Sequence, residues 1–186
     1  MPSPTGELVD ILIPQARVLF VGINPGLRSA EIGHHFAGKG NPFWRLLHAS
    51  GLTPQVLRPE EDRRLAEFGL ALTNLCPRPS RTAAELSRAE IADGAAALRQ
   101  KIAHWQPRVV AFVGVSIYPH VLGHARSGGA GEKPERLAGA QVFVLPNPSG
   151  LNQSFPGFAD KLVWFQRLRL CIERPNDSPP ATASAK

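Results

Sequence analysis

Two short turns rich in asparagine, proline and glycine carry the polar groups of this sequence that could do chemistry. The first turn covers residues 22–26 (GINPG) and the second covers residues 147–150 (NPSG). Each offers an asparagine amide, which both donates and accepts hydrogen bonds, next to glycine, which permits close approach of the backbone. Taken alone, such a turn is ordinary loop chemistry and indicates no particular reaction.

Both turns follow short apolar runs that read as strands buried on both faces. Four strands are predicted, at residues 17–22, 68–75, 108–114 and 141–145. Helical patterns separate them, with start signals at Asn41-Pro42, Pro59, Ser87 and Gly157, and residues 123–135 are predicted to form a flexible loop. This alternation indicates a parallel α/β sheet, whose carboxyl edge would bring the two turns together.

Length and charge narrow the class of protein. The chain has 186 residues with 21 Lys+Arg against 15 Asp+Glu, a formal net charge of +6, which favours a polyanionic partner without choosing between nucleic acid and an anionic membrane. The cysteines number two, which excludes a disulfide framework and four-cysteine zinc or iron–sulfur sites. No apolar run reaches the length of a membrane span and the first residues do not resemble a signal peptide, so we expect a cytoplasmic protein, nucleoid-associated if bacterial.

The chain is expected to form one domain. We predict a weakly structured start over residues 1–10, a single domain over residues 11–174, and a disordered tail over residues 175–186 (PNDSPPATASAK), which has nothing to bury.

Four motifs in order resemble the mismatch-specific uracil-DNA glycosylase / thymine-DNA glycosylase family, within the uracil-DNA glycosylase superfamily. They are GINPG at residues 22–26, GHHF at 33–36, GNPFW at 40–44 and NPSGL at 147–151, and the similarity extends over residues 17–169. The resemblance implies a three-layer α/β/α fold with a four-stranded, mainly parallel central sheet. It also implies a monofunctional DNA glycosylase that hydrolyses the N-glycosidic bond of uracil or a related pyrimidine, especially in G·U mispairs, and leaves an abasic site.

The resemblance assigns roles in the first motif. Asn24 would hold the attacking water and Phe36 would stack on the flipped base, while backbone groups of Ile23 and Phe36 would read the pyrimidine edge. The rest of the base pocket would be Gly22, Pro25, Gly26, Ser29 and Asn147. An amide oxygen is a poor general base near neutral pH, so the site would depend on positioning and on backbone donors.

The last motif resembles the family's insertion loop. Leu151 would enter the gap left by the flipped nucleotide, as an apolar wedge. Its neighbours Ser149, Gly150, Asn152 and Gln153 would face the opposite base. One branch of the family has a basic residue in place of Gln153, so strict preference for guanine opposite the lesion does not carry over. Asn147 stands where the efficient uracil-DNA glycosylases have a histidine.

Other polar residues are weaker candidates. Asp93 is a second catalytic candidate, because the adjacent Gly94 lies inside a predicted helix and would permit close backbone approach. Phosphate contacts are predicted for Arg28, Lys39, Arg78 and Arg81. The adjacent His34 and His35 are interpreted as pocket-loop residues, because adjacent side chains point apart and no third metal ligand is evident.

The predicted partner is double-stranded DNA containing uracil or a mismatch, with no cofactor, metal, membrane or obligate protein partner and with a monomer expected. A DNA-binding protein that recognises damage without cleaving it remains the alternative. A nucleotide-dependent α/β enzyme is disfavoured, because the sequence lacks both a phosphate-binding Gly-Lys-Ser/Thr loop and the dinucleotide glycine fingerprint.

Overall fold

Five strands form one sheet in the order β2-β1-β3-β5-β4. The structure is a computed structural model that describes residues 6–123, 128–149 and 154–174. The strands are β1 (Val18–Gly22), β2 (Leu70–Asn74), β3 (Val109–Val113), β4 (Gly131–Leu137) and β5 (Ala140–Leu145). Neighbours pair in parallel except β4, which runs antiparallel to β5. The predicted α/β sheet is therefore confirmed, with one strand more than the four expected.

The additional strand, β4, lies largely in the segment predicted to be a flexible loop (residues 123–135). Its sequence, GEKPERL, has a pair of charged residues on each side of Pro134, and a proline argues against a central strand. An edge strand tolerates proline because one side of its backbone has no partner, and the β4–β5 register shifts between Lys133 and Arg136, on either side of that proline. The loop prediction was wrong here because edge strands lack the apolar pattern of buried ones.

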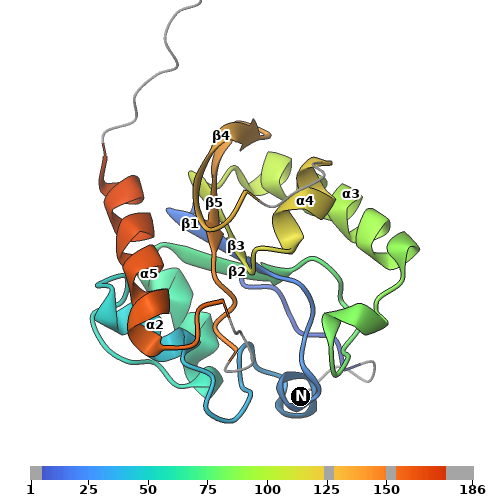
Figure 1. Cartoon of the computed structure of the whole chain (residues 1–186), viewed down its shortest axis with the longest axis horizontal. Helices are drawn as coiled ribbons and strands as arrows, with labels where there is room; N and C mark the ends of the chain where they lie inside the picture. The colour runs from blue at the N-terminus through green and yellow to red at the C-terminus, as the bar shows by residue number, and fades with distance from the viewer. Residues whose placement is uncertain (1–5, 124–127, 150–153, 175–186) are drawn as a thin grey trace, which may run out of the picture.

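Helices cover both faces of the sheet and make three layers. Helices α2 (Phe43–Ala49) and α5 (Phe158–Glu173) lie on one side, and α3 (Arg88–Trp105) and α4 (Ile117–Leu122) lie on the other (Figure 1). The remaining elements are α1 (Leu27–Ile32) and the 3₁₀ helices η1 (Pro59–Phe68) and η2 (Ala83–Glu85). Among the described residues, no helix combines the length and the apolar character needed to cross a bilayer.

Helix start signals in the sequence are reproduced at α3 and α2. The Ser87 hydroxyl accepts the Glu90 N–H at 3.1 Å and the Glu90 carboxylate accepts the Ser87 N–H at 2.8 Å, which is the capping box expected from the spacing. The Asn41 side-chain oxygen accepts the Phe43 N–H at 3.0 Å, and α2 begins at Phe43, one residue after the predicted first position, Pro42. Helices α1 and α4, of six residues each, have no such signal and were not predicted.

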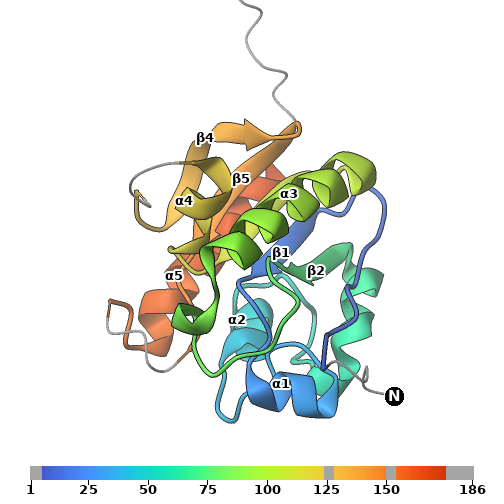
Figure 2. The same cartoon turned by 90° about the vertical axis from the view of Figure 1, so that its right-hand side faces the viewer.

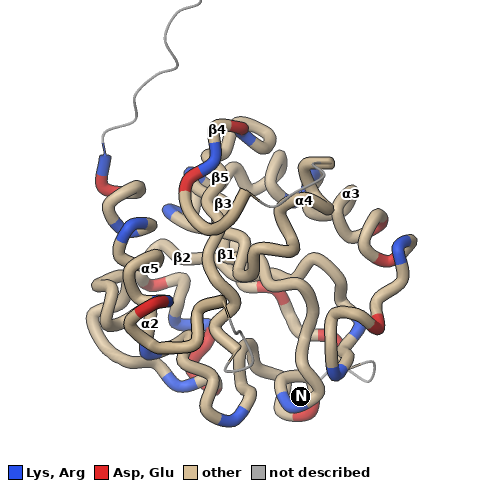
Figure 3. The backbone as a smooth tube through the Cα atoms, viewed as in Figure 1, with Lys and Arg blue, Asp and Glu red and all other residues tan. Residues whose placement is uncertain are grey.

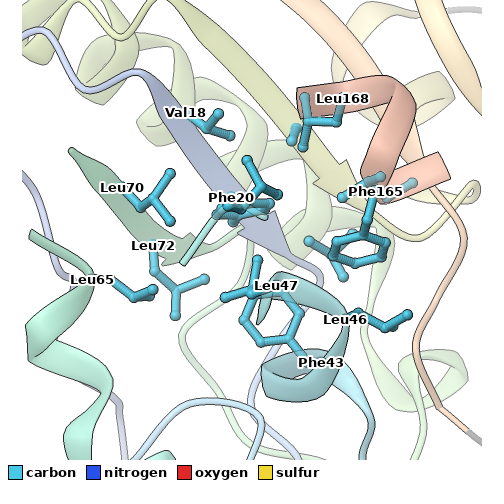
Figure 4. Close-up of a cluster of buried hydrophobic side chains, with 14 of the residues drawn as sticks. Val18, Phe20, Phe43, Leu46, Leu47, Leu65, Leu70, Leu72, Phe165 and Leu168 are labelled. Atoms are coloured by element: carbon cyan, nitrogen blue, oxygen red, sulfur yellow. The ribbon is translucent and has the colours of Figure 1, made fainter. Parts of the chain in front are cut away.

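The core is split by the sheet into two clusters. Val18 and Phe20 face the α2 and α5 side, while Leu19 and Val21 face the α3 and α4 side, and all four are at most 1% exposed. Figure 4 shows the first cluster, in which side chains of β1 and β2 meet those of η1, α2 and α5. Burial on both faces explains why the parallel strands read as continuous apolar runs.

Candidate active site

A cleft of about 490 Å³ lies at the carboxyl edge of the sheet. The chain passes from β1 to β2 on one side and, later, to β3 on the other, so the strand order reverses between β1 and β3 at this edge. The cleft is lined by residues that follow β1, β3 and β5 and by Asn74 at the end of β2. Helix α1, which follows β1, lies at this end of the molecule (Figure 2). Open α/β sheets bind ligands at such a reversal point.

The Asn24 amide is held in one orientation. Its Nδ2 donates to the Arg78 carbonyl at 2.9 Å and to the Ser80 hydroxyl at 2.7 Å, and lies 3.4 Å from the Pro25 carbonyl. Asn24 Oδ1 accepts no hydrogen bond from any residue that the structure describes. The amide therefore presents an acceptor, and not a donor, to a molecule in the cleft.

The partners of Asn24 belong to a turn after β2 that runs beside the turn after β1. The Cys76 N–H donates to the Ile23 carbonyl at 2.8 Å and the Ser80 N–H donates to the Pro25 carbonyl at 3.1 Å. Ser80 is buried, and its hydroxyl donates to the Thr82 carbonyl at 2.7 Å while accepting from Asn24. Because that hydroxyl hydrogen is already committed, Ser80 offers Asn24 only an acceptor.

Phe36 lies in the same cleft, in a strained backbone position. Its φ is +50°, in the left-handed region that residues other than glycine rarely occupy. The ring stacks on Phe43 with centroids 3.9 Å apart and planes 20° apart. Phe36 is half-buried and lines the cleft, so part of its ring can contact a molecule bound there.

A buried carboxylate anchors the loop that carries Phe36. Asp62, in η1 and 3% exposed, accepts the His35 N–H at 3.1 Å, and its other oxygen lies 3.3 Å from His34 Nδ1. The His35 ring is buried with Nε2 3.1 Å from the Val9 carbonyl, and burial lowers the pKa of His35. Both histidines thus belong to the loop, and no three His, Cys, Asp or Glu side chains converge on a possible metal position within the described residues.

Small residues bring other groups close to the cleft. A Cβ on Gly22 would lie 2.6 Å from Asn74 Oδ1, so the absence of a side chain at Gly22 leaves room for the Asn74 amide. The Ser29 hydroxyl accepts the Ala37 N–H at 3.0 Å and ties α1 to the loop after it. Asn74 therefore joins Asn24 at the carboxyl ends of adjacent strands.

The second asparagine turn reaches the same cleft. Asn147 and Ser149 both line it, and the Asn147 side-chain oxygen accepts the Ser149 N–H at 2.9 Å. The predicted wedge Leu151 and its neighbours Gly150, Asn152 and Gln153 lie outside the described residues, as does the predicted tail over residues 175–186.

Asp93 does not line this cleft. It is exposed on α3 and lines a second cleft of about 510 Å³, which adjoins the first through Leu8, Pro25 and Asn74. The geometry therefore gives no support to its predicted part in catalysis. The reasoning about Gly94 is confirmed, since a Cβ there would lie 2.3 Å from the Leu75 carbonyl oxygen.

The four predicted phosphate contacts differ in their surroundings. Arg28 pairs with Glu31 at 2.8 Å, and Arg78 pairs with Glu90 at 2.5 Å. Hydrogen bonds from Arg78 and from the Ser87 N–H lower the pKa of Glu90 to about 2. Lys39 and Arg81 are exposed and have no ion pair within the described residues, and Arg81 lines the first cleft. In the view of Figure 3, basic and acidic residues are interspersed along the backbone.

Several residues that line this cleft, or that hold the loop beside it, were not found from the sequence. Asn74 ends β2, but the predicted strand extends to residue 75, so Asn74 did not fall in a turn after a strand as Asn24 and Asn147 did. Ser80 and Asp62 gave no comparable signal, because a serine in a turn and an acid beside Glu60 and Glu61 are expected at the surface.

The fold and this cleft define a mainly parallel α/β protein that offers an oriented amide and an aromatic ring at the strand-order reversal. Comparison with known proteins is more specific. The chain belongs to the Uracil DNA glycosylase superfamily, which it matches over residues 10–169. It is also similar in fold to the solution NMR structure of a Methanosarcina acetivorans protein that has been proposed to be a uracil DNA glycosylase. That similarity has a TM-score of 0.58 and 21% sequence identity, and it covers 88% of this chain and 97% of the other.

Proposed function

We propose that this protein is a monofunctional DNA glycosylase that flips uracil out of double-stranded DNA and hydrolyses its N-glycosidic bond, with a preference for mispaired uracil. Membership in the superfamily implies glycosylase chemistry. The observation that carries the finer proposal is the Asn24 amide, whose donors are taken by Arg78 and Ser80, so that Oδ1 is left to accept a hydrogen bond from water.

In this mechanism the chain positions the reactants and does not take the proton. Phe36, backed by Phe43, would stack on the extruded base, and Asn24 Oδ1 would orient a water toward C1′ of the sugar. The bond from C1′ to the base nitrogen breaks and the base leaves with the bonding electrons. The water oxygen bonds to C1′ and keeps one proton as the new hydroxyl group, while its other proton passes to solvent or to the departing base. Because an amide cannot act as an effective base, the chemical step should be slow, and extrusion becomes an equilibrium that precedes it. The free energy of extrusion then adds to the observed barrier, which favours mispaired uracil because it is extruded more easily.

The test is base release from duplexes that contain one uracil. We expect free uracil from a G·U duplex, less from an A·U duplex, and no strand nick without added base or heat. Asn24→Ala should reduce release by on the order of a hundredfold, because orientation of the water is lost. Absence of release from every uracil substrate would overturn the enzyme proposal. Tight binding of the G·U duplex in that case would favour the alternative, a non-catalytic damage-binding protein.

A further inference from the structure

Arg78, whose carbonyl binds the Asn24 amide, is also bound through its guanidinium group. The Arg78 carbonyl accepts Asn24 Nδ2 at 2.9 Å. The Arg78 guanidinium donates from Nε to Glu90 Oε1 at 2.5 Å and from Nη2 to Glu90 Oε2 at 3.1 Å. Nη2 also donates to the Glu85 carbonyl at 2.8 Å. One residue thus joins the amide in the cleft to the beginning of α3.

We propose that Arg78 and Glu90 are positioning residues that fix the Asn24 amide through the Arg78 carbonyl. The proposal rests on the proposed function, in which Asn24 orients the attacking water. It also assigns Arg78 a role different from the phosphate contact predicted from the sequence.

The turn around Arg78 depends on side-chain hydrogen bonds for its geometry. Pro77 and Pro79 flank Arg78 and neither has an N–H to donate. Pro79 also restricts Arg78 to extended backbone conformations. The backbone hydrogen bonds that tie this turn to the turn after β1 come from Cys76 and Ser80, on either side of the Pro-Arg-Pro run. The guanidinium therefore supplies the directional contacts at the centre of the turn.

Glu90 is a rigid anchor for that guanidinium. It is the third residue of α3, where its carboxylate also accepts the Ser87 N–H at 2.8 Å. Its helix lies against the end of β2, since a Cβ on Gly94 would lie 2.3 Å from the Leu75 carbonyl. A two-point guanidinium–carboxylate pair fixes direction as well as distance.

The exposure of the Arg78–Glu90 ion pair allows an effect on positioning to be distinguished from an effect on stability. The side chains of Arg78 and Glu90 are 47% and 33% exposed, and ion pairs of that exposure contribute little to the free energy of unfolding. Loss of the pair should therefore alter the rate of chemistry more than the melting temperature.

The experiment compares Arg78→Lys, Arg78→Met and Glu90→Gln in the full chain. The readouts are single-turnover uracil release from a G·U duplex, the Kd for the same duplex with a hydrolysis-resistant 2′-fluoro deoxyuridine, and the dependence of that Kd on salt. Each variant should release uracil roughly tenfold more slowly, because the water-orienting amide loses its support. The Kd and its salt dependence should stay as in the wild type. The double variant Arg78→Met/Glu90→Gln should be no slower than Arg78→Met alone, because both changes break one interaction.

Two controls isolate the pair. Ser87→Ala weakens the cap of α3 without removing a contact of Arg78, so it should lower the melting temperature but leave the release rate within twofold. Arg169→Met removes an ion pair with Glu173 on α5, outside the cleft, and should change neither rate nor Kd.

Three outcomes would overturn the proposal: unchanged release rates in the single variants, additive losses in the double variant, or an equal loss in Ser87→Ala. A different result is that Arg78→Met binds the duplex more weakly and with a flatter salt dependence, while Glu90→Gln keeps a normal rate. That result would overturn the positioning role and indicate that Arg78 contacts a phosphate. Asn24→Ala keeps this test separate from the proposed function. If Asn24→Ala retains full activity, the proposed mechanism fails, whereas a slow Asn24→Ala beside normal Arg78 and Glu90 variants overturns only the positioning role.

Discussion

At the scale of single residues, the orientation of the Asn24 amide matters as much as its identity. A motif selects Asn24 and Phe36 from the sequence because their types and spacing are distinctive. The residues that hold Asn24 and the Phe36 loop in place cannot be found from the sequence in this way. Ser80, which binds Asn24, lies 56 residues from it, and Asp62, which accepts the His35 N–H, lies 27 residues from His35. Such contacts depend on how the chain returns to the sheet edge, which local patterns do not encode.

Asn24→Asp tests that orientation directly. A carboxylate could act as a general base, which would favour a faster reaction. In this site, however, one carboxylate oxygen would replace Nδ2 and face the Arg78 carbonyl, which accepted a hydrogen bond at 2.9 Å. Two facing acceptors cost on the order of 1–3 kcal/mol. We therefore expect Asn24→Asp to release uracil roughly tenfold more slowly than the wild type in single-turnover assays. A rate above that of the wild type would mean that base catalysis outweighs the lost orientation.

At the scale of elements, the sequence predicts the strands that are buried on both faces and the helix that begins with a capping box. The four parallel strands and α3 were predicted because burial on two faces and a capping box leave strong patterns. Strand β4 and helices α1 and α4 were missed because they are at the edge of the sheet or only six residues long. The only sign in the sequence that α3 packs closely against the end of β2 was Gly94, a glycine inside a predicted helix.

Gly94→Ala tests the packing of α3. In an isolated helix this change stabilises by about 1 kcal/mol. Here the new methyl group would meet the Leu75 carbonyl oxygen at 2.3 Å, so the helix must move away from the sheet. We expect a loss of about 1–3 kcal/mol in the free energy of unfolding, measured by urea denaturation. The matched change Ala96→Gly, at an exposed position of the same helix, should cost about 1 kcal/mol. A stabilising effect of Gly94→Ala would contradict the close approach.

The free energy of unfolding should depend on pH through His35, in the loop that carries Phe36. Burial lowers the pKa of His35 below its ordinary value of 6.5, so the folded protein keeps this ring neutral while the unfolded chain takes up a proton. The unfolded state then binds more protons, and stability is full above about pH 6.5 and falls as the pH drops below it. The variant His35→Gln retains a donor for the Val9 carbonyl and cannot titrate. Its melting temperature should fall less than that of the wild type between pH 7.5 and 5.5, and equal falls would contradict the assignment.

At the scale of the whole molecule, the net charge of +6 is a sum over basic and acidic residues, which are interspersed along the backbone in the view of Figure 3. Acidic partners already compensate Arg28 and Arg78, whereas Lys39 and Arg81 are exposed and unpaired within the described residues. The attraction for DNA should therefore come from a few uncompensated cations near the cleft and not from the total charge.

Salt dependence of DNA binding measures how many of those cations contact phosphates. Each true phosphate contact contributes about 0.9 to the slope of log K against log salt concentration, so Lys39→Met and Arg81→Met should each reduce the slope by about 1. The affinity loss should be similar for matched and mispaired duplexes, because phosphates carry no base identity. Arg169→Met, which breaks a pair with Glu173 away from the cleft, removes the same charge and should leave the slope unchanged. Equal effects of all three variants would mean that net charge, and not the position of Lys39 and Arg81, determines binding.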